Sequence, residues 1–170
     1  KNSGRGRVGG FWFNFGGKNC VDLNVTPDGN VTIAQGPIDV GGSRASIAMA
    51  VAEEMGITYN QVRSIIADTS SLGHNDMTDG SRGTFSTSMA AIFAARNAII
   101  VLRERAAKTW DIPLAEVEWR DGAAHAKGAG HGNRTPLSLK DLAHTDGRPG
   151  GPIAGPAERV ADQPADPLSP

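Results

Sequence analysis

The chain has 170 residues and a formal net charge of −1. This length is enough for one domain with a hydrophobic core, and the near-neutral charge does not suggest nucleic acid or an anionic membrane as a partner. The single cysteine, Cys20, excludes an internal disulfide framework and any zinc or iron–sulfur site built from cysteines, and it agrees with a cytoplasmic location.

No apolar run reaches the roughly 20 residues of a membrane span, and no signal peptide is recognisable. The sequence begins Lys-Asn-Ser-Gly without a methionine, so we expect a piece of a longer polypeptide.

Alternating apolar residues and turn chemistry predict a β-sheet in the first third of the chain. Strands are expected at 7–15, 19–25 and 31–36, with the last two joined as a hairpin through the turn "TPDGN". A helix is predicted over 43–55, with Ser43 as its N-cap and Gly56 ending it. A strand with a buried middle should follow at 61–68, which makes strand–helix–strand a βαβ-like unit.

A long polar loop, 69–84, precedes a predicted helix over about 85–108. The apolar side of this helix is expected to hold Phe85, Met89, Ile92, Phe93, Ile99 and Leu102. So few strands cannot cover Ile92, Phe93 and Ile99 together, so we expect association with a partner or with a second copy.

The last third of the chain is expected to contain two small elements and a tail. A hairpin is predicted at 116–128 around Asp121-Gly122, and a short helix at 138–143 capped by Ser138. We expect a domain over 1–144 and a Pro/Gly-rich linker or tail over 145–170. The fold class is α+β: a mixed sheet with an N-terminal β-hairpin, two main helices on one face and an irregular C-terminal tail.

Two glycine-rich turns, each followed by a helix, are the main candidates for a site. They are "VGGSRAS" (40–46) and "TDGSRGTFS" (78–86). A helix N-terminus offers unpaired N–H groups and a positive dipole end, so it favours phosphate or another anion. A plain capped helix is the alternative for each turn. Neither has the Gly-Lys-Ser/Thr signature of a P-loop or the three-glycine spacing of a dinucleotide fold.

Other candidate residues favour a structural role. The segment "GRGRVGG" (4–10) could contact an anion, but a solvated terminus is the commoner case. The histidines lack metal-ligand spacing and no nucleophile-elbow pattern is present, so we assign no metal ligand and no catalytic residue. Asp68 could be catalytic, but we expect it to bond to its own loop.

Several segments in order resemble one family. They are "GRGRVGGF", "VDLNVTPDGNVTIAQGPIDVGGS", "IAMAVAEEMGI" and "VRSIIADTSSLGHNDMTDGSRGT", followed by the long helix. Together they resemble the molybdopterin-binding subunit of the xanthine dehydrogenase and aldehyde oxidase family of molybdenum hydroxylases. The resemblance runs from about residue 4 to 143 and would correspond to a central slice of that large subunit.

The resemblance implies a shared molybdenum cofactor, molybdopterin or its dinucleotide form, held jointly with the remainder of the subunit. One side of the cofactor would be lined by Gly41, Gly42 and Ser43. A second, anion-holding turn would consist of Gly80, Ser81, Arg82, Gly83 and Thr84. The implied partners are the rest of the molybdenum subunit, an iron–sulfur subunit and a flavin subunit, and the implied activity is oxidation of an aldehyde or N-heterocycle.

Two departures separate this sequence from the family pattern. The family has Gly-Gln-Gly at the first turn, with a Gln that contacts the cofactor, where this chain has Gly41-Gly42-Ser43. The family's general base, a glutamate far downstream, matches no segment here, so the chain should be catalytically silent alone. Two alternatives remain: an orphan domain of this fold that binds another anion or a protein, and a free-standing phosphate-binding module.

Overall fold

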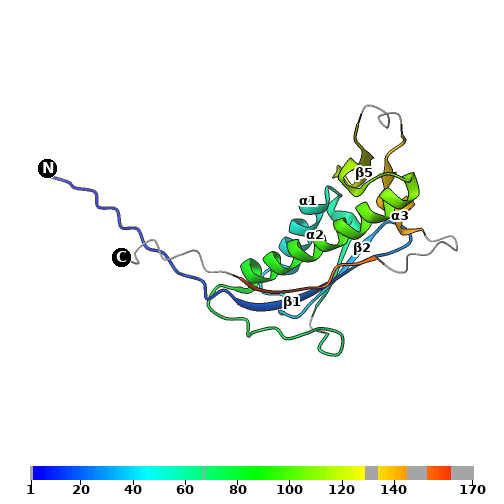
Figure 1. Ribbon diagram of the computed structural model, residues 1–170. Coiled ribbons are helices and arrows are strands. Elements are labelled where there is room, and N and C mark those ends of the chain that lie inside the picture. The colour runs from blue at the N-terminus through cyan, green and yellow to red at the C-terminus, as the bar shows by residue number, and fades with distance from the viewer. Residues whose placement is uncertain (1, 67, 129–133, 145–152, 162–170) are drawn as a thin grey trace.

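The computed structural model describes residues 2–66, 68–128, 134–144 and 153–161. A mixed sheet carries two long helices on one face, and a smaller sheet lies near the C-terminal end of the longer helix (Figure 1). This confirms the predicted α+β class. The elements are β1 (Gly17–Val25), β2 (Val31–Gln35), α1 (Ser43–Met55), η1 (Tyr59–Gln61), β3 (Val62–Ile66), α2 (Gly83–Trp110), η2 (Leu114–Glu116), β4 (Val117–Arg120), β5 (Ala123–Ala126), β6 (Leu137–Ser138), α3 (Leu139–Ala143), β7 (Ile153–Ala154) and β8 (Ala157–Ala161).

The predicted hairpin forms the centre of the main sheet. β1 and β2 pair antiparallel, from Val21 opposite Gln35 to Val25 opposite Val31, around the turn at Asp28-Gly29. Alternation along both strands buries one face against the helices, as the period of two requires. β3 pairs parallel to β2 with α1 between them in sequence, which confirms the βαβ-like unit. The predicted burial of the middle of β3 is wrong, because β3 is an edge strand and Ile65 is 41 % exposed.

The long helix α2 spans the sheet with an unexpected side turned inward. Its buried residues are mainly alanines, together with Ser86, Thr87 and Leu102, whereas Phe85, Met89, Ile92, Phe93 and Ile99 are only half-buried. Of the predicted apolar side, Leu102 is fully buried and Phe93 and Ile99 pack against the core while half-buried, so the alanines, which were not predicted, form most of the buried face. Small side chains let the helix approach the sheet and α1 closely, and this tight contact has no room for a phenylalanine. Length and hydropathy alone would also suit a membrane span, but 44 % of that window is buried within the domain.

Two strands in the C-terminal segment were not predicted from the sequence. β7 and β8 both pair antiparallel with the edge of β1 that faces away from β2. Between them Gly155 donates its N–H to the Leu23 carbonyl at 2.8 Å and lies directly against α2. Their sequence is short and rich in proline and glycine, and it is the open edge of β1 that provides their backbone partners. Residues 145–152 and 162–170 lie outside the described residues.

The predicted strand at 7–15 is wrong. These residues form no strand, and Val8, Phe11 and Trp12 are 101 %, 82 % and 73 % exposed. Their β-forming side chains have no partner strand, since β2 occupies one edge of β1 and β7 and β8 occupy the other. In contrast, the hairpin β4–β5 and the helix α3 form as predicted, and Ser138 caps α3 by accepting from the Asp141 N–H at 3.2 Å.

Candidate cofactor-binding site at the ends of two helices

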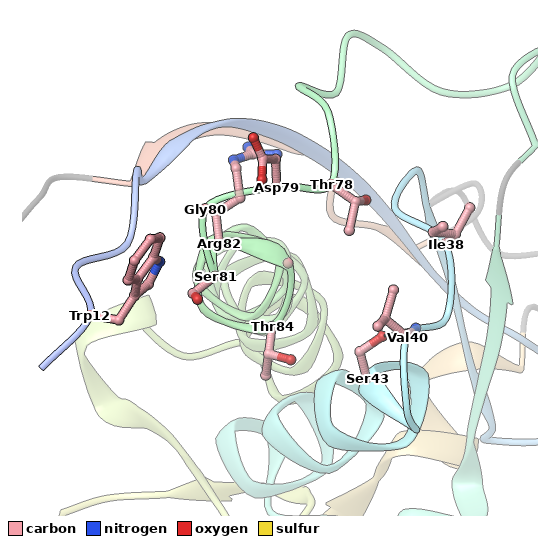
Figure 2. A pocket seen from close by; sticks show the side chains of 11 residues that line it. Trp12, Ile38, Val40, Ser43, Thr78, Asp79, Gly80, Ser81, Arg82 and Thr84 are labelled. Carbon is pink, nitrogen blue, oxygen red and sulfur yellow. Dashed lines mark hydrogen bonds between the residues drawn. The ribbon is translucent and has the colours of Figure 1, made fainter.

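The two glycine-rich turns meet at one cavity of about 440 Å³. Figure 2 shows Ser43 at the start of α1 and Thr84 at the start of α2 on opposite sides of the gap. The lining comes from three segments: Trp12; Ile38, Val40 and Ser43; and Thr78, Asp79, Gly80, Ser81, Arg82, Gly83 and Thr84. Of the predicted site residues, the structure therefore brings Ser43 and all five of the second turn together.

The N-terminus of α2 presents backbone donors to this cavity. The N–H groups of Gly83, Thr84 and Phe85 have no hydrogen-bond partner among the described residues, whereas the Ser86 N–H donates to the Arg82 carbonyl at 2.8 Å. Free N–H groups at the positive end of a 28-residue helix favour an anion. The hydroxyl groups of Ser81 and Thr84 lie beside them as further donors.

The turn before α2 has an unusual backbone. Gly80 and Ser81 have φ angles of 54° and 57°, so a serine occupies the left-handed region that glycine adopts more easily. Gly80 is required for a second reason, because a Cβ there would lie 1.8 Å from the Phe15 ring. The Phe15 N–H also donates to the Gly80 carbonyl at 3.1 Å. Strain of this kind concentrates at functional sites, so Ser81 is a candidate for a functional rather than a packing role.

The side chain of Arg82 is buried and directed away from the cavity. It is 3 % exposed, and its Nη1 donates to the carbonyls of Asp76 and Met77 at 2.9 and 2.8 Å. Its Nη2 donates to the Lys18 carbonyl at 2.9 Å, and its Nε to that of Gly16. Figure 2 shows the guanidinium on the far side of the turn from Ser43. Only the backbone of Arg82 is thus close to the cavity centre.

The N-terminus of α1 is already occupied by a carboxylate of the chain itself. Asp39 accepts from the Arg44 N–H at 3.1 Å and from the Ser43 hydroxyl at 3.3 Å. These hydrogen bonds, the backbone one first, and the charge of Arg44 hold the pKa of Asp39 below its usual value. The prediction of Ser43 as N-cap is wrong, since Gly42, with φ of 89°, takes that position.

Gly41 and Gly42 do not line the cavity, and a Cβ at either would meet no atom within 4 Å. Their positive φ angles of 63° and 89° explain why glycine is present at both positions. Sequence reasoning missed Asp39, because it lies three residues before the N-cap Gly42 and outside the position that N-cap preferences describe.

The loop 68–82 is structured by its own polar side chains. Asp68 accepts from the Ser70 N–H at 3.0 Å and from the hydroxyls of Ser70 and Ser71, which confirms the predicted role in its loop. His74 lies 2.9 Å from the Asp76 carboxylate. No group of three or more metal-ligating side chains occurs in the described ranges, and His131 falls outside them. Trp12 also lines the cavity, which no feature of its local sequence indicated.

Comparison with known proteins identifies a family and several solved structures that are similar to this chain. The family model of the molybdopterin cofactor-binding domain matches residues 4–159. Reconstituted CO dehydrogenase from Oligotropha carboxidovorans is similar, with a TM-score of 0.72, 22 % identity, and 86 % of this chain but 18 % of that chain covered. Quinoline 2-oxidoreductase from Pseudomonas putida 86 is similar with a TM-score of 0.70, 16 % identity, and coverages of 88 % and 19 %.

This chain spans less than a fifth of the length of these solved structures, and at such identities the likeness shows the fold. The family match covers most of the chain and extends past residue 144 into β7 and β8. The chain therefore belongs to the family of molybdopterin cofactor-binding domains.

Proposed function

We propose that this chain is part of a molybdenum hydroxylase and holds the anionic portion of the molybdenum cofactor at the N-terminus of α2. The observation that supports this most directly is the set of unpartnered N–H groups at Gly83, Thr84 and Phe85 in a chain of a molybdopterin-binding family. A phosphate monoester or pyrophosphate would complete the hydrogen bonding of that helix end.

The residues around the cavity fit such a group. Ser81 and Thr84 add hydroxyl donors, and Ile38, Val40 and Trp12 form apolar walls suited to a flat ring system. A volume of about 440 Å³ lies within the range of small-molecule sites. The α1 end contributes less than expected, because Asp39 already accepts from the Arg44 N–H and the Ser43 hydroxyl. We therefore assign the anion to Gly83, Thr84, Phe85 and Ser81, and a flanking position to Ser43.

The remaining parts of the site would come from other polypeptide segments. The bound cofactor would supply the redox chemistry, and this chain would bind and orient it. Less than a fifth of each similar structure is covered by this chain, so the rest of a molybdenum subunit is the partner we propose, with iron–sulfur and flavin subunits beyond it. The exposed parts of the half-buried residues Ile92, Phe93 and Ile99 of α2 would lie against that remainder, although Phe93 and Ile99 also pack against this chain's own core.

The test is retention of cofactor by the chain expressed in cells that synthesise molybdopterin. Thr84→Val removes one hydroxyl at the cavity without changing side-chain size, and we expect the pterin recovered per chain, measured by fluorescence after oxidation, to fall. The matched control is Thr109→Val at the opposite end of α2, where the hydroxyl donates to the Arg105 carbonyl at 2.9 Å. Equal pterin content in wild type and Thr84→Val, or equal loss in both variants, would contradict the assignment.

A further inference from the structure

Arg82 carries the charge and the N–H donors typical of an anion ligand, but its side chain bonds only to other groups of the protein. Its guanidinium offers five N–H donors. Four of them donate to the carbonyls of Gly16, Lys18, Asp76 and Met77. The amide of Asn19, oriented so that both its atoms are satisfied, accepts the fifth from Nη2 at 3.3 Å. No donor of this side chain is left for a ligand.

The partners of Arg82 belong to separate segments that meet behind the turn. Gly16 directly precedes β1 and Lys18 is its second residue, whereas Asp76 and Met77 lie in the loop that leads to α2. Asp76 also links the loop to β1, because its carboxylate accepts from the Lys18 N–H at 2.6 Å and its N–H donates to the Lys18 carbonyl at 3.0 Å. Asp76 Oδ2 is also 3.8 Å from Arg82 Nη2, so the buried cation has a counter-charge.

The contacts of Arg82 and Asp76, here called the clamp, lie on the side of the turn before α2 that faces away from the cavity. Residues 78–82 lead into α2 and contain the strained Ser81, and the free N–H groups of Gly83, Thr84 and Phe85 follow directly at the start of the helix. In Figure 2 the guanidinium extends toward β1, while Ser81 and Thr84 border the cavity. We propose that Arg82, together with Asp76, is a positioning residue that holds this turn in its binding conformation and does not contact the bound anion. This inference rests on the proposed function of the cavity.

Substitutions of Arg82 and Asp76 should change anion affinity in a way that charge alone does not predict. A lysine keeps the positive charge but presents one compact ammonium group, which cannot reach carbonyls on separate segments. Arg82→Lys should therefore lose anion affinity as fully as Arg82→Gln, by about tenfold or more, equivalent to one charge-assisted hydrogen bond. Removing the negative charge of Asp76 would raise anion affinity by electrostatics alone, but Asp76→Ala should lower it because the loop is released.

The experiment uses the full chain, inorganic pyrophosphate as the probe and calorimetric titration. Amide hydrogen exchange at residues 78–85 is measured in parallel without ligand, and Arg63→Gln, on exposed β3 surface, is the control. We expect faster exchange and weaker binding in Arg82→Lys, Arg82→Gln and Asp76→Ala, with no change in the control. Near-wild-type affinity in Arg82→Lys, or higher affinity in Asp76→Ala, would overturn the proposal.

Two further readouts separate the possible failures. Circular dichroism and urea unfolding show whether each variant is folded, and if the Arg82 variants do not fold, Asp76→Ala alone decides by the direction of its affinity change. If wild type binds no pyrophosphate, the proposed function fails, while unchanged exchange at 78–85 in the variants would independently refute the clamp.

Discussion

Replacing Ser81 by glycine should raise the stability of the chain and weaken its hold on the cofactor. Ser81 has a φ of 57°, a conformation that costs an L-residue about 1–2 kcal/mol. Glycine relieves this strain but loses about 0.5–1 kcal/mol more backbone entropy on folding. The expected net gain is about 0.5–1 kcal/mol, or a rise of roughly 1–4 °C in Tm for a domain of this size.

The same substitution removes a hydroxyl that lines the cavity. A hydrogen bond to a charged group contributes about 1.5–3 kcal/mol, so the Kd for a phosphate-bearing ligand should rise about 10- to 100-fold. Ser81→Ala is the matched control, because it removes the hydroxyl and keeps the strained backbone. It should show the same loss of affinity without the gain in stability.

The assay combines urea unfolding followed by circular dichroism with titration of pyrophosphate into each variant. A glycine variant more stable than both wild type and the alanine variant, with weak binding in both variants, would agree with the reasoning. If Ser81→Gly is no more stable than Ser81→Ala, the strain is not relieved by glycine and the argument from the backbone fails. If both variants bind like wild type, the hydroxyl has no role in binding.

Two other predictions concern the fold around the site. Gly155→Ala should destabilise the chain by about 1–3 kcal/mol, since the added Cβ would lie 2.1 Å from the Ala94 carbonyl oxygen of α2. Urea unfolding measures the loss, and Gly9→Ala, where a Cβ would meet no atom within 4 Å, is the control. A loss of stability below that range would contradict the packing of β7 and β8 against α2. Asp76, whose pKa is held below its usual value by the Lys18 N–H, His74 and Arg82, should stabilise the chain at neutral pH and lose this effect in acid, as the pH falls through the lowered folded-state pKa. Unfolding from pH 7 to 2.5 should show Asp76→Asn less stable at neutral pH and equal to wild type in strong acid; a constant difference would refute the linkage.

Local chemistry explains why much of the fold is predictable from the sequence. The hairpin around Asp28-Gly29, the helix 43–55 ended by Gly56 and the α3 cap at Ser138 all depend on residues near one another in the chain. Each has a short-range physical cause: a turn, a left-handed glycine or a capping side chain. Long-range partners are not needed to form them.

Tertiary contacts explain what the sequence does not predict. Whether alanines or phenylalanines of α2 face inward depends on how close the sheet lies, and β7 and β8 depend on the free edge of β1. In the site, the sequence indicates both glycine-rich turns, but it does not indicate how the two helix ends differ. Asp39 occupies one helix end and Arg82 turns its charge away from the other, and both facts depend on the folded positions of distant carbonyls and N–H groups.

The central claim is that this chain holds molybdenum cofactor as part of a larger enzyme. It is tested most directly by purifying the protein from its native cells with its partners, and measuring molybdenum, pterin and co-purifying chains by mass spectrometry. The account predicts molybdenum and pterin in amounts comparable to the chain, together with the remainder of a molybdenum subunit. A monomer without molybdenum, pterin or a large partner would contradict it.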